Sequence, residues 1–174
     1  MASELQVTTI RGVPTGANAN QIIVPSGQTL YAPGHVIQVL QLVWPTYQQI
    51  SVNTYTATGL TQSITPKSAS SKILVNISVN SGNSGSNAAE NAFALYRGSS
   101  LIETYERGIF AYDPGGAQVH VDANIFLSLL DSPNTTSATT YTLYGKTSSG
   151  NLRFNDHISS GFGQSTMTLM EIAQ

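Results

Sequence analysis

The chain has 174 residues, no cysteine, 9% charged residues and a formal net charge of −2. A domain of this length buries roughly 70% of the surface of its unfolded chain, so it needs no covalent staples. Without cysteine, disulfides and thiolate metal sites are excluded, and the seven scattered Lys and Arg residues form no basic patch, so we expect no nucleic-acid partner.

Residues 1–34 differ in character from the rest, because short apolar runs alternate there with Gly, Pro and Asn turns. The segment holds too few apolar residues for a core of its own. We expect an extended β arm lying on a neighbour, or a stalk in which several copies wind together, and a disordered tail is the alternative. The residues expected to make the docking and oligomer contacts are Leu5, Val7, Ile10, Ile22, Val24, Leu30 and Tyr31.

No targeting or membrane-spanning segment is expected. The first residues have neither the basic nor the apolar region of a signal peptide. The longest apolar stretch, residues 36–44, is interrupted by Gln38 and Gln41 and is too short to cross a bilayer.

Residues 35–174 have the turn spacing and alternation of one all-β domain. Residues 36–44 are apolar on both faces, which predicts a strand covered on one side by the second sheet and on the other by a neighbouring subunit. Further strands are expected at 49–58 and 73–79, followed by a flexible loop at 81–87. The alanines of residues 88–96 also suit a helix, but Arg97–Ser100 resembles a hairpin turn. We therefore expect a strand there and another at 101–105.

The clearest strand lies at residues 118–129. Its apolar side chains face one way and its polar side chains face the other, with Phe126 the single apolar exception on the polar face. Strands are also expected at 139–146, 151–154 and 166–172. Eight or so strands at this spacing predict an antiparallel jelly-roll or Greek-key sandwich.

Few side chains suggest catalysis or metal binding. His120 and Asp122 are two residues apart on one predicted strand, so they share a face and offer an imidazole and a carboxylate to a metal. No third ligand is indicated, and the polar face of a strand needs such residues in any case. Glu103 and Glu106 are three apart and so face opposite ways, unlike a glycosidase pair. With no Gly-x-Ser-x-Gly turn either, we expect no enzyme activity and no cofactor.

Tyrosines are the most promising binding residues, because saccharides stack on flat rings that carry a hydroxyl. Tyr112 and Asp113 begin a turn-rich loop at residues 112–116, and loops on rigid sandwiches commonly carry recognition. Most other aromatic residues are expected to lie half in the core: Trp44, Tyr47, Tyr55, Tyr96, Tyr105, Tyr141 and Tyr144.

Several stretches together resemble small virion structural and fibre-like proteins of tailed bacteriophages, the marine and cyanobacterial phages especially. These are residues 64–75 (ITPKSASSKILV), 94–98 (ALYRG) and 165–173 (STMTLMEIA), with the layout of residues 5–10 and 33–39. The resemblance implies a trimeric jelly roll, similar to the C1q and tumour-necrosis-factor heads, preceded by a short intertwined stalk or docking arm. It carries no catalytic residues.

The expected organisation is therefore an arm at residues 1–34 and a jelly-roll body at 35–174. The expected function is that of a trimeric fibre or appendage tip, made in the host cytoplasm and exposed on the virion surface. The arm would dock it to other virion proteins, and sandwich loops would contact host glycans. One alternative is a capsid decoration protein of the same shape, and another is a carbohydrate-binding module or glycan hydrolase, which would be monomeric with an aromatic platform.

Overall fold

The computed structural model describes residues 32–85, 89–111, 119–156 and 163–174, with the single residues Thr9, Thr15, Val24 and Leu30. It describes the backbone alone for residues 107–111, 119 and 120. The chain divides into Met1–Tyr31 and Ala32–Gln174, and the fold below is that of the second unit. The predicted division at residue 34 stays a prediction, because most of the first unit lies outside the described residues.

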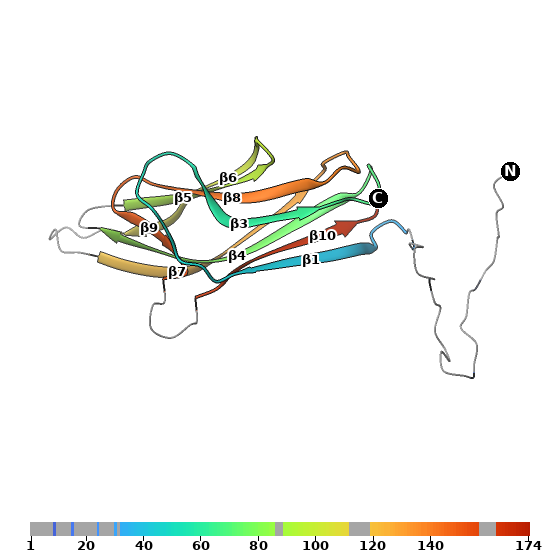
Figure 1. The fold of residues 1–174 in the computed structure, drawn as a ribbon, viewed down its shortest axis with the longest axis horizontal. Coiled ribbons are helices and arrows are strands. Elements are labelled where there is room, and N and C mark those ends of the chain that lie inside the picture. The colour runs from blue at the N-terminus through green and yellow to red at the C-terminus, as the bar shows by residue number, and fades with distance from the viewer. Residues whose placement is uncertain are drawn as a thin grey trace. The chain divides into compact units, whose positions relative to one another are not determined.

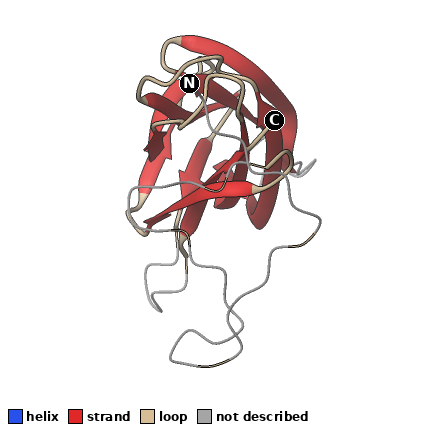
Figure 2. Ribbon diagram, turned by 90° about the vertical axis from the view of Figure 1, so that its right-hand side faces the viewer, coloured by secondary structure: helices blue, strands red, loops and turns tan. Residues whose placement is uncertain are grey.

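The second unit is a sandwich of two antiparallel sheets (Figures 1 and 2). The first sheet has six strands: β1 (Val36–Trp44), β2 (Gln48–Ile50), β4 (Lys72–Gly85), β7 (Val119–Asp131), β9 (Asn151–Phe154) and β10 (Ser165–Ile172). β4 pairs with β7 along one edge and, along its other edge, first with β10 and then with β9. β1 pairs with β10 and β2 with β9, so the sheet is four strands wide.

The second sheet has the order β3-β8-β5-β6. Its strands are β3 (Thr56–Ile64), β5 (Ala89–Arg97), β6 (Ser100–Ala111) and β8 (Thr139–Thr147). No helix is present among the described residues, so none there is long and apolar enough to cross a membrane.

The pairing is nested about the turn between β5 and β6. β5 pairs with β6, β4 with β7, β3 with β8, and the β1–β2 run with the β9–β10 run. The second unit is thus one long hairpin whose arms wrap into two layers, which is the topology of a jelly roll. Gly98 occupies the tip with a φ of 58°, a conformation that favours glycine. The predicted all-β jelly-roll sandwich is confirmed.

The core fills the space between the two sheets. Phe93 from the second sheet meets Phe154 from the first edge-on, with ring centroids 6.1 Å apart, and Trp44 lies 5.8 Å from Phe154. Burying an apolar side chain fully stabilises the fold by about 1.5–3 kcal/mol. Other fully buried members of the cluster are Leu60, Ile64, Ile73, Val75, Ile77, Val79, Leu95, Tyr141, Leu143, Leu152, Met167 and Leu169.

Two sequence predictions about the strands are wrong. The predicted loop at residues 81–87 is strand as far as Gly85, because β4 stays paired with β7 to its end and with β9 over residues 81–84. The predicted strand at 49–58 is interrupted at residues 51–55. Ile50 pairs with β9 in the first sheet and Thr56 with β8 in the second, so the chain changes sheets there.

Candidate functional site

The predicted ligand and metal residues lie mostly where the structure does not describe side chains. Tyr112 and Asp113 lie outside the described residues, and His120 is described by its backbone alone. Asp122 is exposed on the outward face of β7, opposite Gly82 of β4. Within the described part of the chain, no cluster of three His, Asp or Glu side chains is placed to hold a metal. Both sites stay predictions.

The predicted arm contacts are described at two positions only. Val24 and Leu30 are exposed within this single chain. Leu5, Val7, Ile10, Ile22 and Tyr31 lie outside the described residues. Their docking role stays a prediction.

The outward side of the first sheet carries a regular grid of side chains, which we call the outer face. Backbone register aligns residues of β1, β10, β4 and β7 into cross-strand rows. Every second row points outward, and three successive outward rows form the grid. The rows are Val39, Met170, Leu74 and Leu130; Gln41, Thr168, Asn76 and Ser128; and Val43, Thr166, Ser78 and Phe126.

The apolar members of the outer face are uncovered in this chain. Val39 is 54% exposed, Val43 46%, Phe126 68% and Leu130 48%. Leu40, Leu42 and Trp44 pack on the core, so the predicted cover by the second sheet is confirmed on that side of residues 36–44. Cover of the opposite side by a neighbouring subunit stays a prediction. Phe126 lies on the outward side, as the alternation predicts.

No charged side chain lies within the three rows, and the polar middle row is hydrogen-bonded within itself. Gln41 Nε2 donates to Thr168 Oγ1 at 3.1 Å, and Ser128 Oγ donates to Asn76 Oδ1 at 2.8 Å. Polar groups that already have partners cost less to remove from water. The outer face can therefore be buried against another surface without leaving a charge unpaired.

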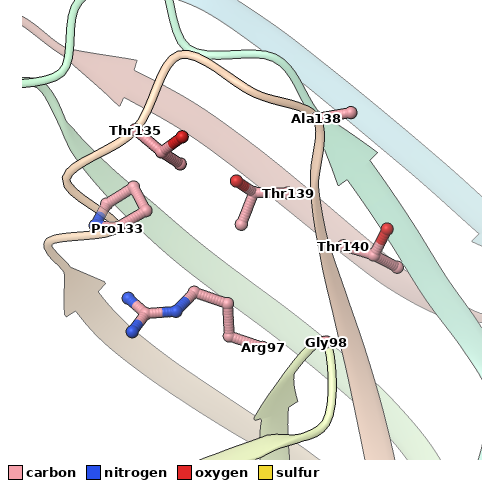
Figure 3. Close-up of a pocket in the computed structure, with 7 residues that line it drawn as sticks. All are labelled: Arg97, Gly98, Pro133, Thr135, Ala138, Thr139 and Thr140. Carbon is pink, nitrogen blue, oxygen red and sulfur yellow. The ribbon is translucent and has the colours of Figure 1, made fainter.

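A second feature is a pocket of about 290 Å³ beside the turn between β5 and β6, with a lining of mixed polarity (Figure 3). The guanidinium group of Arg97 lies beside Pro133 in this view, and threonine hydroxyls lie opposite it. The pocket is lined by Arg97, Gly98, Pro133, Thr135, Ala138, Thr139 and Thr140.

The charged group of this pocket is engaged in holding the two sheets together. Arg97 Nη1 donates to Asp131 Oδ1 at 2.9 Å and to Oδ2 at 2.8 Å, and Tyr141 donates its hydroxyl proton to Oδ2 at 2.6 Å. Burial and the neighbouring Asp131 carboxylate raise the pKa of Tyr141 well above its ordinary value. With its pKa raised this far, the Tyr141 hydroxyl keeps its proton, so it stabilises the fold and is not suited to proton transfer.

No protein-family model matches the chain, and no curated protein matches it. Solved structures align with the chain at low scores. The VP2 subviral particle of infectious bursal disease virus aligns with a TM-score of 0.41 and 11% identity over 88% of this chain and 42% of VP2. Dimeric latent PorU from Porphyromonas gingivalis aligns with a TM-score of 0.39 and 10% identity over 89% of this chain and 15% of PorU.

The chain thus spans less than half of either protein. At these scores and identities, neither likeness supports an inference about what this chain does.

The sequence gives only a partial signal for the outer face. Apolar residues on both sides of 36–44, and Phe126 among polar positions, indicate an uncovered apolar surface. The rows themselves depend on which strands are neighbours and in which register, which no local pattern specifies.

Proposed function

We propose that the chain is a non-enzymatic virion structural protein, a homotrimeric fibre or appendage tip. The arm of residues 1–34 docks it to other virion proteins, and the sandwich is exposed on the particle surface, where it meets the host. The observation that carries the proposal is the uncharged, partly apolar outer face, which spans four strands and is open in the single chain.

Self-association is the simplest way to cover this surface. Contiguous apolar surface on a soluble protein commonly marks an interaction site, and the row of Val39, Met170, Leu74 and Leu130 is apolar across all four strands. Because no charged side chain lies within the three rows, the outer face can meet a surface of the next copy without burying an unpaired charge, and salt does not screen the contact. A fibre or capsid protein benefits from this, since its contacts must survive outside the cell.

The trimer is what the phage-protein resemblance implies, and it sets a geometric requirement. A face packed on its own copy by a twofold axis gives a dimer, whereas a closed ring of three needs the outer face to meet a different surface of the next copy. The number of copies therefore reports directly on how the outer face is used.

Two matched substitutions test the role of the outer face. We expect Phe126→Glu to reduce the native mass to that of one chain without loss of β-structure, because Phe126 is 68% exposed and contributes little to the core. Leu101→Glu is the control, since Leu101 is 50% exposed on β6 of the other sheet. Light scattering after size exclusion gives the mass, and an assembled Phe126→Glu variant would contradict the proposal.

A further inference from the structure

Tyrosines gather on the outward side of the second sheet. The rings of Tyr96 on β5 and Tyr144 on β8 lie 4.1 Å apart between centroids with an interplanar angle of 33°. Tyr55, which precedes β3, lies at the same surface together with Glu106 of β6 and Lys146 of β8. We call these five residues the tyrosine face.

Strand register explains why these side chains share one surface. Tyr144 and Lys146 alternate with the buried Leu143 and Gly145 along β8, so they point away from the core. Tyr96 pairs with Thr142, which alternates in the same sense. Tyr96 and Tyr144 are thus diagonal neighbours on adjacent strands, a spacing that aromatic side chains span easily.

Alanines lie beneath the long side chains. On β5, Ala92 pairs with Lys146 and Ala94 pairs with Tyr144, and both alanines are buried although they belong to the outward alternation of the strand. Small residues at these positions let the tyrosine rings lie low over the sheet instead of standing apart.

Polar groups are fixed beside the rings. Tyr55 donates its hydroxyl proton to Glu106 Oε1 at 2.7 Å, Lys146 Nζ lies 3.4 Å from the same oxygen, and Lys146 Nζ lies 4.5 Å from the centre of the Tyr55 ring. Burial and the Glu106 carboxylate raise the pKa of Tyr55 above its ordinary value. The carboxylate and the ammonium balance each other, so the tyrosine face has no net charge.

We propose that the tyrosine face binds a neutral pyranose saccharide. Partly exposed tyrosine rings offer flat surfaces for the C–H face of a sugar. The Glu106 carboxylate, the Lys146 ammonium and the Thr142 hydroxyl beside them offer acceptors and donors for its hydroxyl groups. The balance of Glu106 and Lys146 favours a neutral ligand over an acidic one. This inference rests on the proposed function for its biological setting. It deepens that function by naming the class of ligand that the sandwich binds on a host.

The test starts with an array of neutral and acidic pyranose oligosaccharides, probed with the full chain. The strongest neutral saccharide is then titrated while backbone amide NMR signals are followed. We expect shifts at Tyr96, Thr142 and Tyr144, and a loss of affinity of about tenfold in Tyr96→Ala, as befits removal of one stacking ring. Tyr47→Ala is the control, because Tyr47 is an exposed tyrosine elsewhere on the sandwich.

Three results would overturn the inference: no neutral saccharide bound on the array, equal affinity of the Tyr96→Ala variant and the parent, or shifts confined to the Arg97 pocket. Melting temperature confirms that each variant is folded. Failure here is distinct from failure of the proposed function. A trimer that binds no sugar overturns the inference alone, whereas a monomer that binds sugar at the tyrosine face overturns the trimer alone.

Discussion

The hydroxyl of Tyr141 on β8 donates a 2.6 Å hydrogen bond to Oδ2 of Asp131 at the end of β7. These strands belong to different sheets, so the bond joins the two layers of the sandwich at the end where β5 turns into β6. Arg97 completes the group from β5 with its two contacts to the same carboxylate. The Asp131 carboxylate thereby links β5, β7 and β8.

Removing this hydroxyl is expected to destabilise the fold measurably. Tyr141 is fully buried, and a hydrogen bond to a charged group contributes about 1.5–3 kcal/mol. Tyr141→Phe should therefore lower the free energy of unfolding by about 2 kcal/mol in urea titrations. Tyr47→Phe makes the same chemical change at an exposed hydrogen bond to Gln49 and should have almost no effect. Equal stability of both variants would show that the Tyr141 bond does not stabilise the sandwich.

A second buried polar contact lies in the part of β4 that its sequence marks as loop. Asn83 Nδ2 donates to Asn91 Oδ1 at 2.8 Å, and both side chains are fully buried between the sheets. Asn83→Leu alone strands a buried amide and should cost about 1–3 kcal/mol. The double variant Asn83→Leu with Asn91→Leu should recover most of that loss, because neither buried amide remains. Thr147 Oγ1, which also accepts from Asn83 Nδ2 at 3.3 Å, keeps its own bond to Ser149 O. Denaturant unfolding of the two single variants, Asn83→Leu and Asn91→Leu, and of the double variant measures the coupling, and additive losses would contradict it.

The sequence pattern predicted the strands in which apolar residues alternate with polar ones in step with the buried and exposed positions. The alternation around Phe126, the turn at Gly98 and the alternation of β8 all follow from period 2 and turn chemistry. The extension of β4 did not, because Ser, Gly and Asn at 81–85 have low strand propensity and are held in place by two neighbouring strands.

Side-chain constellations were harder to predict than strands. The tie between Tyr141 and Asp131 and the stack of Tyr96 on Tyr144 both join segments that only the topology brings together. The aromatic residues were recognisable as candidate sugar platforms, but the sequence did not reveal which of them share a surface. Residue type is local information, whereas the grouping depends on sheet order and register.

The carboxyl group of Glu106 should titrate below its ordinary range. Its pKa is lowered chiefly by the hydrogen bond from Tyr55 and further by Lys146. A lowered folded pKa means that this contribution to stability is present above the unfolded pKa and is lost as pH falls through the folded one. We expect Tyr55→Phe to raise the Glu106 pKa toward its ordinary value in carboxyl-carbon NMR titrations. An unchanged pKa would show that the Tyr55 bond is not its cause.

Truncation tests whether the body folds without the arm and whether the arm is needed for docking. The core cluster draws on residues from Trp44 to Leu169, and Gly34 N donates to Ala173 O at 2.8 Å. A chain beginning at Ala32 keeps all of these groups, so it should retain its β-rich circular dichroism and cooperative unfolding while losing incorporation into particles. Normal incorporation of the truncated chain would contradict the docking role of the arm.

The most direct measurement is the native mass of the full chain by light scattering after size exclusion, at about 0.1 M and about 1 M salt. A homotrimer held by the uncharged outer face predicts three times the 18.4 kDa of one chain at both salt concentrations. The mass of a single chain at either concentration would contradict the trimer, and a mass of two chains would show a twofold pairing in its place.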